Sequence, residues 1–550
     1  MAAATSTELQ LQSSDPASSR RGGWSTFPFI IGSLAGLTLA VSGWGTNLVV
    51  YLIEKFHVES IAATQIVNIV SGCTSLLPVI GAIIADSFGC FSVICISAFI
   101  SLLGTILIAL TSILKTLRPQ LCESGSWFCS SPSKIQFAVL YSGVALGSIG
   151  LGGTRFTIAA LGANQFDRVK EKEVFFNWFV VIMYASAVTG STVIVYIEDN
   201  VSWTLAYGIC VVANVISICI FLLGSRYYRL VNPRGSPFMS LARVVVAAIR
   251  KRNFKISSKA EDYYHGEDTP KEIVASTPIK SFEFLNRAAL ITEGDIRSDG
   301  SISKPWRLCS QQEVEDLKTL IRIFPILSSG IFLSTPIAVI SSLTVLQALT
   351  VDRHFGPYFK IPAGSMIVFI LTSTAVSVTL VDRFLYPIWQ KLIGQPPTPL
   401  QRIGLGHVIN ALGMAIAAIV ESKRLEVARS RHHMDQPGST VPMLVLWFVP
   451  QLAVVGFGEA FHYPGQVTFY YQEFPKSLRS TATAMISMIM GIAYYLSTAI
   501  IDLIQRVTGW LPNDINNGRM DNVYWMLLVV AVLNFFYYLL CARFYKYQIP

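Results

Sequence analysis

Two ionisable side chains lie within long apolar stretches of the sequence. Arg155 follows a glycine-rich run that begins at Gly147, and Glu459 ends a short run that begins at Gly456. A charged side chain at membrane depth is costly and therefore suggests a function by default. Because the cation and the carboxylate belong to opposite halves of the chain, they could pair in one state of a transport cycle and separate in another. A static buried ion pair is the alternative.

The sequence lacks the patterns that are typical of enzymes and metal sites. The glycines from Gly147 to Gly153 have no preceding strand and no following Lys-Ser or Lys-Thr, as a phosphate-binding loop requires. Close helix packing is the better interpretation of these small residues. His432 and His433 are adjacent and do not have the i, i+4 spacing of a helical metal site. With no G-x-S-x-G motif either, we expect no enzyme, no metal and no cofactor.

Composition excludes a soluble protein. Only 14% of the 550 residues are charged, whereas a soluble domain carries about 25%. Hydrophobic residues make up 52% and the mean hydropathy is +0.52. Several apolar stretches reach the roughly 18 residues needed to cross a bilayer. The net charge of +9 comes mainly from the segments between these stretches, which indicates membrane topology and no nucleic-acid partner.

Hydropathy windows of about 19 residues predict twelve membrane spans, six before and six after a long polar segment. Among them, the fifth is predicted over 175–197 and the ninth over 403–420. The fold class is therefore an all-α membrane protein. The predicted parts are a cytoplasmic tail over 1–26, a six-helix bundle over 27–224, a cytoplasmic linker over 225–316, a second six-helix bundle over 317–545 and a tail over 546–550.

Basic residues orient the spans. The segments before the first span, after the fourth and after the sixth are basic, so both termini are predicted to be cytoplasmic. The basic run 423–431 follows the ninth span and disagrees with this orientation. Cys122 and Cys129 then lie outside, where oxidising conditions permit a disulfide. Their spacing allows the bond without requiring it, and the other seven cysteines are expected to be free thiols.

Motifs along nearly the whole chain resemble the proton-dependent oligopeptide transporter family, whose plant branch is the nitrate/peptide transporter group. The strongest resemblance runs from Gly150 to Asp167 and continues at Phe175–Phe179. Further similarity lies at Gly81–Asp86, Trp306–Lys318, Asp352–Arg353, Ile361–Ser365 and Gly458–Phe461. The resemblance implies a major facilitator fold, in which two six-helix bundles give alternating access to a central site.

The first helix departs from the family pattern. Proton-coupled members resemble each other in a Glu-x-x-Glu-Arg motif that follows Phe-Pro-Phe-Ile-Ile-Gly. Here Phe27–Gly32 is intact, but the motif positions hold Leu34, Leu37 and Thr38. The resemblance therefore puts the usual route of proton coupling in doubt, although Glu459 could still carry a proton.

The resemblance also assigns roles to site residues. Arg155 matches a fourth-helix lysine and Glu459 a tenth-helix glutamate, and in relatives these residues look like a gating ion pair. An arginine adds a planar fork that suits a trigonal or carboxylate-like anion. Some nitrate-carrying relatives have a histidine near the position of Ile337, and this chain has none on that helix. Lys318 and Gln347 are further candidates for substrate binding.

Together the lost acids and Arg155 resemble the plant nitrate excretion transporter subgroup. This resemblance implies nitrate efflux across the plasma membrane without obligatory proton coupling, and the vacuolar membrane is the less favoured location. Chloride or an organic anion such as a glycosylated metabolite is an alternative substrate. A non-transporting membrane sensor is the alternative from another class. Besides the anion and the lipid bilayer, a kinase acting on the linker is a possible partner.

Overall fold

The structure is a computed structural model that describes most of the chain. The described residues are 22–119, 132–230, 237–257, 259, 262–265, 282–297, 302–430, 440–474 and 482–545. Cys122, Cys129, His432 and His433 lie outside the described residues, so the disulfide stays a prediction. Seven cysteines are described, and all are free thiols.

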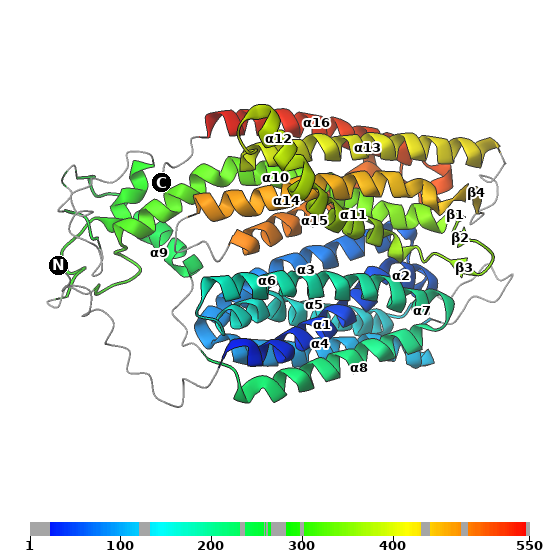
Figure 1. The fold of residues 1–550 in the computed structure, drawn as a ribbon, viewed down its shortest axis with the longest axis horizontal. Coiled ribbons are helices and arrows are strands. Elements are labelled where there is room, and N and C mark those ends of the chain that lie inside the picture. Colours follow the sequence, from blue (N-terminus) through cyan, green and yellow to red (C-terminus); the bar gives the residue numbers. More distant parts are fainter. Residues whose placement is uncertain are drawn as a thin grey trace. The chain divides into compact units, whose positions relative to one another are not determined.

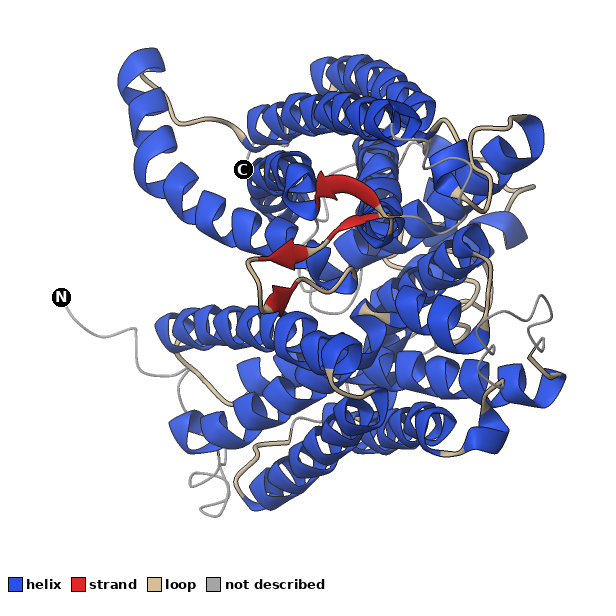
Figure 2. Ribbon diagram, turned by 90° about the vertical axis from the view of Figure 1, so that its right-hand side faces the viewer, coloured by secondary structure: helices blue, strands red, loops and turns tan. Residues whose placement is uncertain are grey.

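Helices dominate the described part of the chain (Figure 2). Twelve of its helices are long and apolar enough to cross a membrane. The all-α membrane fold with twelve spans is therefore confirmed. The few strands are short: β1 (Val351–Asp352) pairs in parallel with β4 (Val441–Leu444), and β2 (His354–Phe355) pairs with β3 (Phe359–Lys360).

The chain divides into two compact units whose boundaries do not simply follow its two halves. Unit 1 holds residues 1–58, 80–233 and 360–365, and unit 2 holds residues 59–79, 234–359 and 366–550. Each half of the chain thus contributes a short segment to the unit built mainly from the other half. Figure 1 shows the course of the chain through these elements.

Unit 1 contains the first group of membrane helices. Its elements are η2 (Gly23–Thr26), α1 (Phe27–Thr46), α2 (Leu48–Phe56), the end of α3 (Ser60–Phe88), α4 (Cys90–Ile113), η3 (Lys115–Leu117), α5 (Lys134–Ala163), α6 (Val169–Thr189), the π-helix η4 (Gly190–Ile194), α7 (Val195–Asn200), α8 (Trp203–Leu223) and η5 (Gly224–Arg226).

Unit 2 contains the start of α3, the described part of the linker and the second group of membrane helices. Its further elements are α9 (Pro237–Arg250), η7 (Glu283–Ala289), α10 (Gln311–Leu349), η8 (Gly364–Met366, whose first two residues belong to unit 1), α11 (Ile367–Leu380), the π-helix η9 (Val381–Leu385), α12 (Tyr386–Ile393), α13 (Pro399–Ser430), η11 (Val445–Phe448), α14 (Val449–Glu473), α15 (Ala482–Val507), η13 (Ile515–Asn517) and α16 (Met520–Phe544).

The glycine run on α5 packs this helix closely against its neighbours. A Cβ atom on Gly150 would lie 2.5 Å from the backbone nitrogen of Ser101 on α4. A Cβ on Gly153 would overlap the hydroxyl of Ser97, also on α4. Only residues without a side chain allow backbones to approach so closely in a membrane bundle. The interpretation of the run as a packing surface is therefore confirmed.

The motif positions on α1 face the apolar core of unit 1. Leu34 and Leu37 are each 4% exposed and belong to one hydrophobic cluster with Ile94, Ile158 and Ile218. In this chain, apolar packing occupies the positions at which proton-coupled relatives are expected to have acids.

Capping boxes fix where two of the long helices begin. At the start of α5, the Ser133 hydroxyl accepts a hydrogen bond from the backbone N–H of Gln136, and the Gln136 side chain accepts one from the backbone N–H of Ser133. Ser310 and Glu313 do the same for α10. Each capping box provides hydrogen-bond acceptors for two backbone N–H groups that would otherwise lack a partner at the start of the helix. The box therefore fixes the residue at which the helix begins.

Two basic residues of the run 423–431 have acidic partners within α13, which continues to Ser430. Arg424 is fully buried and pairs with Glu421 at 2.7 Å, and Lys423 pairs with Glu426 at 2.8 Å. The predicted end of the ninth span near residue 420 was therefore too early. The positive-inside rule counts basic residues whatever acidic partners they have, so this run still disagrees with the predicted orientation.

The described part of the linker forms a small folded body, which we call the linker module. In it α9 and η7 pack with the start of α10 around Val244, Ala247, Leu285, Ala289 and Val314. Its ion pair between Lys251 and Asp295 has a distance of 2.8 Å, and both side chains are 1% exposed. The linker is thus, in its described residues, folded onto unit 2 rather than extended.

Candidate functional site

Arg155 lies on the face of α5 opposite to the packed glycines. Its side chain is exposed, and no acidic side chain among the described residues of unit 1 pairs with it. The glycine face fixes the rotation of α5 against α4, and this rotation decides which way Arg155 points. A guanidinium with five free N–H donors can bind a planar anion through two parallel hydrogen bonds.

Glu459 lies on α14 of unit 2 and is partly buried. Its one described hydrogen bond comes from the hydroxyl of Thr374 on α11, at 3.3 Å. The nearby Gly456 and Gly458 pack α14 against α11 and α13, since a Cβ on either would lie within 2.8 Å of a neighbouring atom. No basic side chain of the described part of unit 2 pairs with Glu459. The expected gating pair with Arg155 involves two units and stays a prediction.

Lys318 lies near the start of α10. Its ammonium is fully buried and forms an ion pair with Glu315, one turn earlier, at 2.7 Å. A lysine that already has an anionic partner attracts an added anion less strongly than a free one. Its expected role in substrate binding has not been tested.

Gln347 belongs to a buried polar network at the other end of α10. It donates a hydrogen bond to Glu421 at 2.6 Å and accepts one from Tyr524 at 3.1 Å. Glu421 in turn forms a bidentate pair with Arg424, which also donates to Asn516. This network joins α10, α13 and α16, so Gln347 has a structural task besides any contact with substrate.

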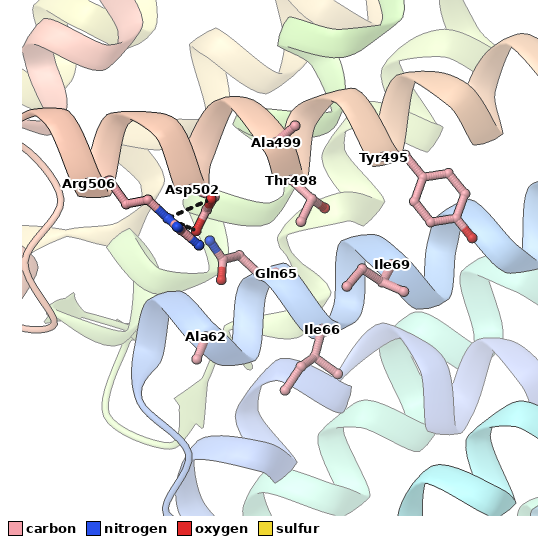
Figure 3. Close-up of a pocket in the computed structure, with 9 residues that line it drawn as sticks. All are labelled: Ala62, Gln65, Ile66, Ile69, Tyr495, Thr498, Ala499, Asp502 and Arg506. Atoms are coloured by element: carbon pink, nitrogen blue, oxygen red, sulfur yellow. Dashed lines mark hydrogen bonds and ion pairs between the residues drawn. The ribbon is translucent and has the colours of Figure 1, made fainter.

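A groove of about 480 Å³ lies between α3 and α15 within unit 2 (Figure 3). One end holds the ion pair of Asp502 and Arg506, toward which the amide of Gln65 is turned. The hydroxyl of Tyr495, at the other end, contacts the sulfur of Cys73 at 3.0 Å. The residues lining the groove are Ala62, Gln65, Ile66, Ile69, Tyr495, Thr498, Ala499, Asp502 and Arg506. None of the predicted site residues lines it.

Sequence reasoning missed two buried histidines of unit 2. His407 on α13 stacks on Tyr538 of α16 at 4.6 Å, and His462 lies on α14. No described residue hydrogen-bonds to a ring nitrogen of either one. A single histidine in a span gives little signal, because only the packing of α13 on α14 brings the two near each other. No group of three or more potential metal ligands occurs among the described residues.

Glu198 was also missed, for a simpler reason. It lies at the end of α7, one residue beyond the predicted limit of the fifth span at Ile197, and was therefore not counted as a charge within a span. In the structure it is 2% exposed and neither carboxylate oxygen has a hydrogen-bond partner among the described residues.

A family model described as the POT family matches residues 91–517 of the chain. The chain belongs to the POT family, in its NRT1/PTR branch. It is 52% identical over 539 residues to Protein NRT1/PTR FAMILY 2.6 of Arabidopsis thaliana, covering 98% of this chain and 95% of the relative. It is 53% identical over 538 residues to Protein NRT1/PTR FAMILY 2.7 of the same plant, with the same coverage of both chains.

Solved POT structures share the fold. An auto-inhibited POT family peptide transporter matches with a TM-score of 0.69 and 18% identity, covering 96% of this chain and 99% of that one. A peptide transporter POT in complex with sulfate matches with a TM-score of 0.64 and 13% identity, covering 95% and 97%. As a member of the POT family, the chain is a multi-pass transmembrane transporter and not an enzyme. The predicted family is thus confirmed, while the comparisons do not name the nitrate excretion subgroup.

Proposed function

We propose that this POT transporter exports a small inorganic anion, nitrate first, across the plant plasma membrane without obligatory proton coupling. The observation that carries the proposal is Arg155, an exposed guanidinium on α5 that lacks an acidic partner in the described part of unit 1. A free arginine fork matches the planar geometry of nitrate.

The packing of α1 supports the absence of proton coupling through the first helix. Leu34 and Leu37 fill the core of unit 1, so no carboxylate is available there to take up and release protons. Export needs no other driving force, since an anion leaving a cell gains about 2.3 kcal/mol per charge for each 100 mV of inside-negative potential.

Glu459 has the role of a gate in this proposal. With only Thr374 as a described hydrogen-bond partner, its carboxylate is available to pair with Arg155 when no anion is bound. An entering anion would compete with the carboxylate for the same guanidinium. Lys318 and Gln347 are secondary candidates for contacts with the anion, because each already has a protein partner.

The decisive experiment measures nitrate and chloride efflux from proteoliposomes in which the voltage and the pH gradient are clamped separately. The proposal predicts nitrate efflux that follows voltage at zero pH gradient. Efflux that stops without a pH gradient would contradict uncoupled export. A chloride flux larger than the nitrate flux would identify chloride as the main substrate and would leave the proposed mechanism of export unchanged.

Two alternatives have distinct outcomes in the same assay. An organic-anion transporter would move neither inorganic ion but would move a glycosylated metabolite supplied inside the vesicles. A sensor would move nothing, and its linker module would instead bind a partner or accept phosphate from a kinase. The linker module is a folded body that could serve such a role, but nothing in its described residues favours it over transport.

A further inference from the structure

Residues Lys360–Ser365, which we call the strap, are docked on unit 1 although the chain on both sides of them belongs to unit 2. Ala363 and Ser365 in the strap are buried. The Ser365 hydroxyl donates a hydrogen bond of 2.7 Å to the carbonyl of Ser191. Ser191 lies in the π-helix η4. Such wide turns release backbone groups from the regular helical ladder and often mark functional sites.

Asn47, between α1 and α2, is the second anchor of the strap. A Cβ atom on Gly364 would lie 2.5 Å from the side-chain oxygen of Asn47 and 3.1 Å from its Cα. The strap therefore rests directly on this residue. Asn47 is fully buried, and neither its amide nitrogen nor its amide oxygen has a hydrogen-bond partner of normal geometry among the described residues.

The carboxyl group of Glu198, at the end of α7, lies next to the Asn47 side chain. Both carboxyl oxygens are buried, and no described residue forms a hydrogen bond of normal geometry with either one. An ionised carboxylate in such a place is very costly, so the group binds a proton instead. It can ionise only if water reaches it.

Few other groups around Glu198 can titrate near neutral pH. The neighbouring elements contribute the phenols of Tyr51 on α2 and Tyr207 on α8 and the thiol of Cys210 on α8. Phenols and thiols release their protons well above neutral pH. Asp199, the next residue of α7, is less buried and has interactions of its own.

We propose that Glu198 is a proton-binding site that controls whether the strap stays docked on unit 1. A protonated Glu198 tolerates burial beneath Asn47 and the strap, whereas the ionised form favours an undocked strap that admits water. A low pH therefore keeps the strap docked on this end of unit 1, and a high pH favours the undocked strap. In the predicted orientation this end faces the outside. The inference goes beyond anion export and holds whichever anion is carried.

The test uses cysteine labelling in the absence of any transported anion, so that its outcome is independent of the proposed substrate. Ala363→Cys places a thiol in the middle of the strap, at a position that is fully buried while the strap is docked. A membrane-impermeant maleimide reacts with the thiolate, whose fraction itself rises with pH. The labelling rate is therefore divided at each pH by that of Tyr358→Cys, a reference position that is 94% exposed. This normalised rate should increase as the external pH rises. For one proton, the ratio of undocked to docked strap changes at most about tenfold per pH unit. Labelling of the parent protein measures the background from the native cysteines, and this background is subtracted.

Substitutions at position 198 decide whether this residue is the sensor. In the Glu198→Gln background, the normalised labelling rate of Ala363→Cys should be low and independent of pH. Glu198→Asp keeps a titratable group and should move the midpoint of the pH dependence without removing it. Asp199→Asn is the matched control. It removes a charge next to Glu198, so it should keep the pH dependence and change only its midpoint. Infrared difference spectra of the protein without the added cysteine should contain a protonated-carboxyl band that Glu198→Gln removes. Three results would overturn the proposal. They are a normalised labelling rate of Ala363→Cys that does not change with pH, a pH dependence of labelling that remains in Glu198→Gln, and an infrared spectrum without the protonated-carboxyl band.

Discussion

At the scale of single residues, the charged side chains of this protein differ in whether they have a partner. Lys318, Lys251 and Arg424 are buried against carboxylates, whereas Arg155 is exposed without one in the described part of its unit. A paired charge stabilises local structure, while an unpaired one in a bundle is available for an anion. This contrast makes Arg155 the first residue to change.

Arg155→Ala should abolish nitrate flux, and Arg155→Lys should weaken it about 10- to 100-fold, because a lysine keeps the charge but loses the bidentate hydrogen bonds, worth about 1.5–3 kcal/mol. The measurement is nitrate efflux from proteoliposomes with equal amounts of reconstituted protein. Arg226→Lys, an exposed arginine of the same unit, is the matched control. Undiminished flux in Arg155→Ala would remove this residue from the site.

Asp295→Asn should destabilise the linker module by about 3–5 kcal/mol, because it leaves the Lys251 ammonium buried without an anion. Thermal unfolding in detergent and limited proteolysis of the linker would measure the loss. Glu293→Gln, an exposed acid two residues earlier, is the control and should change little. Equal stability of the two variants would show that the buried pair is not a major source of stability.

The same pair gives the module a defined response to acid. Burial by itself would raise the pKa of Asp295, but hydrogen bonds and charge from Lys251, together with hydrogen bonds from Thr292, hold that pKa below its ordinary value. The stabilisation is therefore fully present above the ordinary pKa of about 3.9 and is lost as the pH falls through the lowered value. Proteolysis of the module should accelerate only in strong acid.

At the scale of elements, α1 shows how packing and function compete for the same helix face. Its motif positions point into the core of unit 1, where Leu34 and Leu37 pack against α4, α5 and α8. Acids on this face of a helix must share a charge with a nearby base or stay protonated, because the surroundings are apolar. Leucines at these positions need neither a nearby base nor a bound proton. They therefore also leave this face of α1 without a group that binds protons.

Leu34→Glu and Leu37→Glu, combined with Thr38→Arg, should make transport depend more strongly on the pH gradient, since the triple variant restores the Glu-x-x-Glu-Arg pattern. The measurement is efflux as a function of the pH gradient at clamped voltage. Leu34→Gln with Leu37→Gln and Thr38→Arg is the uncharged control for loss of core packing. A flat response in a folded triple variant would mean that α1 does not set coupling in this protein.

At the scale of the whole molecule, α3 connects the two units. Its residues up to Val79 belong to unit 2 and those from Ile80 onward belong to unit 1, and Pro78 lies at this boundary inside the helix. Proline removes one helical hydrogen bond and weakens the helix at that point. The boundary between the compact units thus lies next to the proline that interrupts the helical hydrogen bonds of α3.

Pro78→Ala should stiffen α3 and slow transport several-fold while leaving anion affinity nearly unchanged, because hinge residues act on the conformational step rather than on binding. Separate measurements of nitrate binding to detergent-solubilised protein and of nitrate flux would distinguish these effects. Pro336→Ala, a proline within α10 and inside unit 2, is the matched control. A loss of affinity in Pro78→Ala would argue against a hinge.

The sequence by itself determined the class of this protein. Apolar stretches long enough to cross a bilayer leave the backbone no choice but to form helices, so the twelve spans followed from hydropathy alone. The glycines of α5 indicated close helix packing, because a residue without a side chain lets a neighbouring helix backbone approach closely in a membrane. The family followed from motifs spread along the chain, and the comparisons confirm it.

Only the tertiary structure decided which charges are free. The sequence places Arg424 in a basic segment beyond a span, yet its bidentate pair with Glu421 is buried near the end of α13. Glu198 read as a residue outside the membrane, yet it is enclosed next to Asn47, beneath a strap that is far away in the sequence. Burial and pairing depend on which helices meet, and contacts between distant segments leave no local pattern in the sequence.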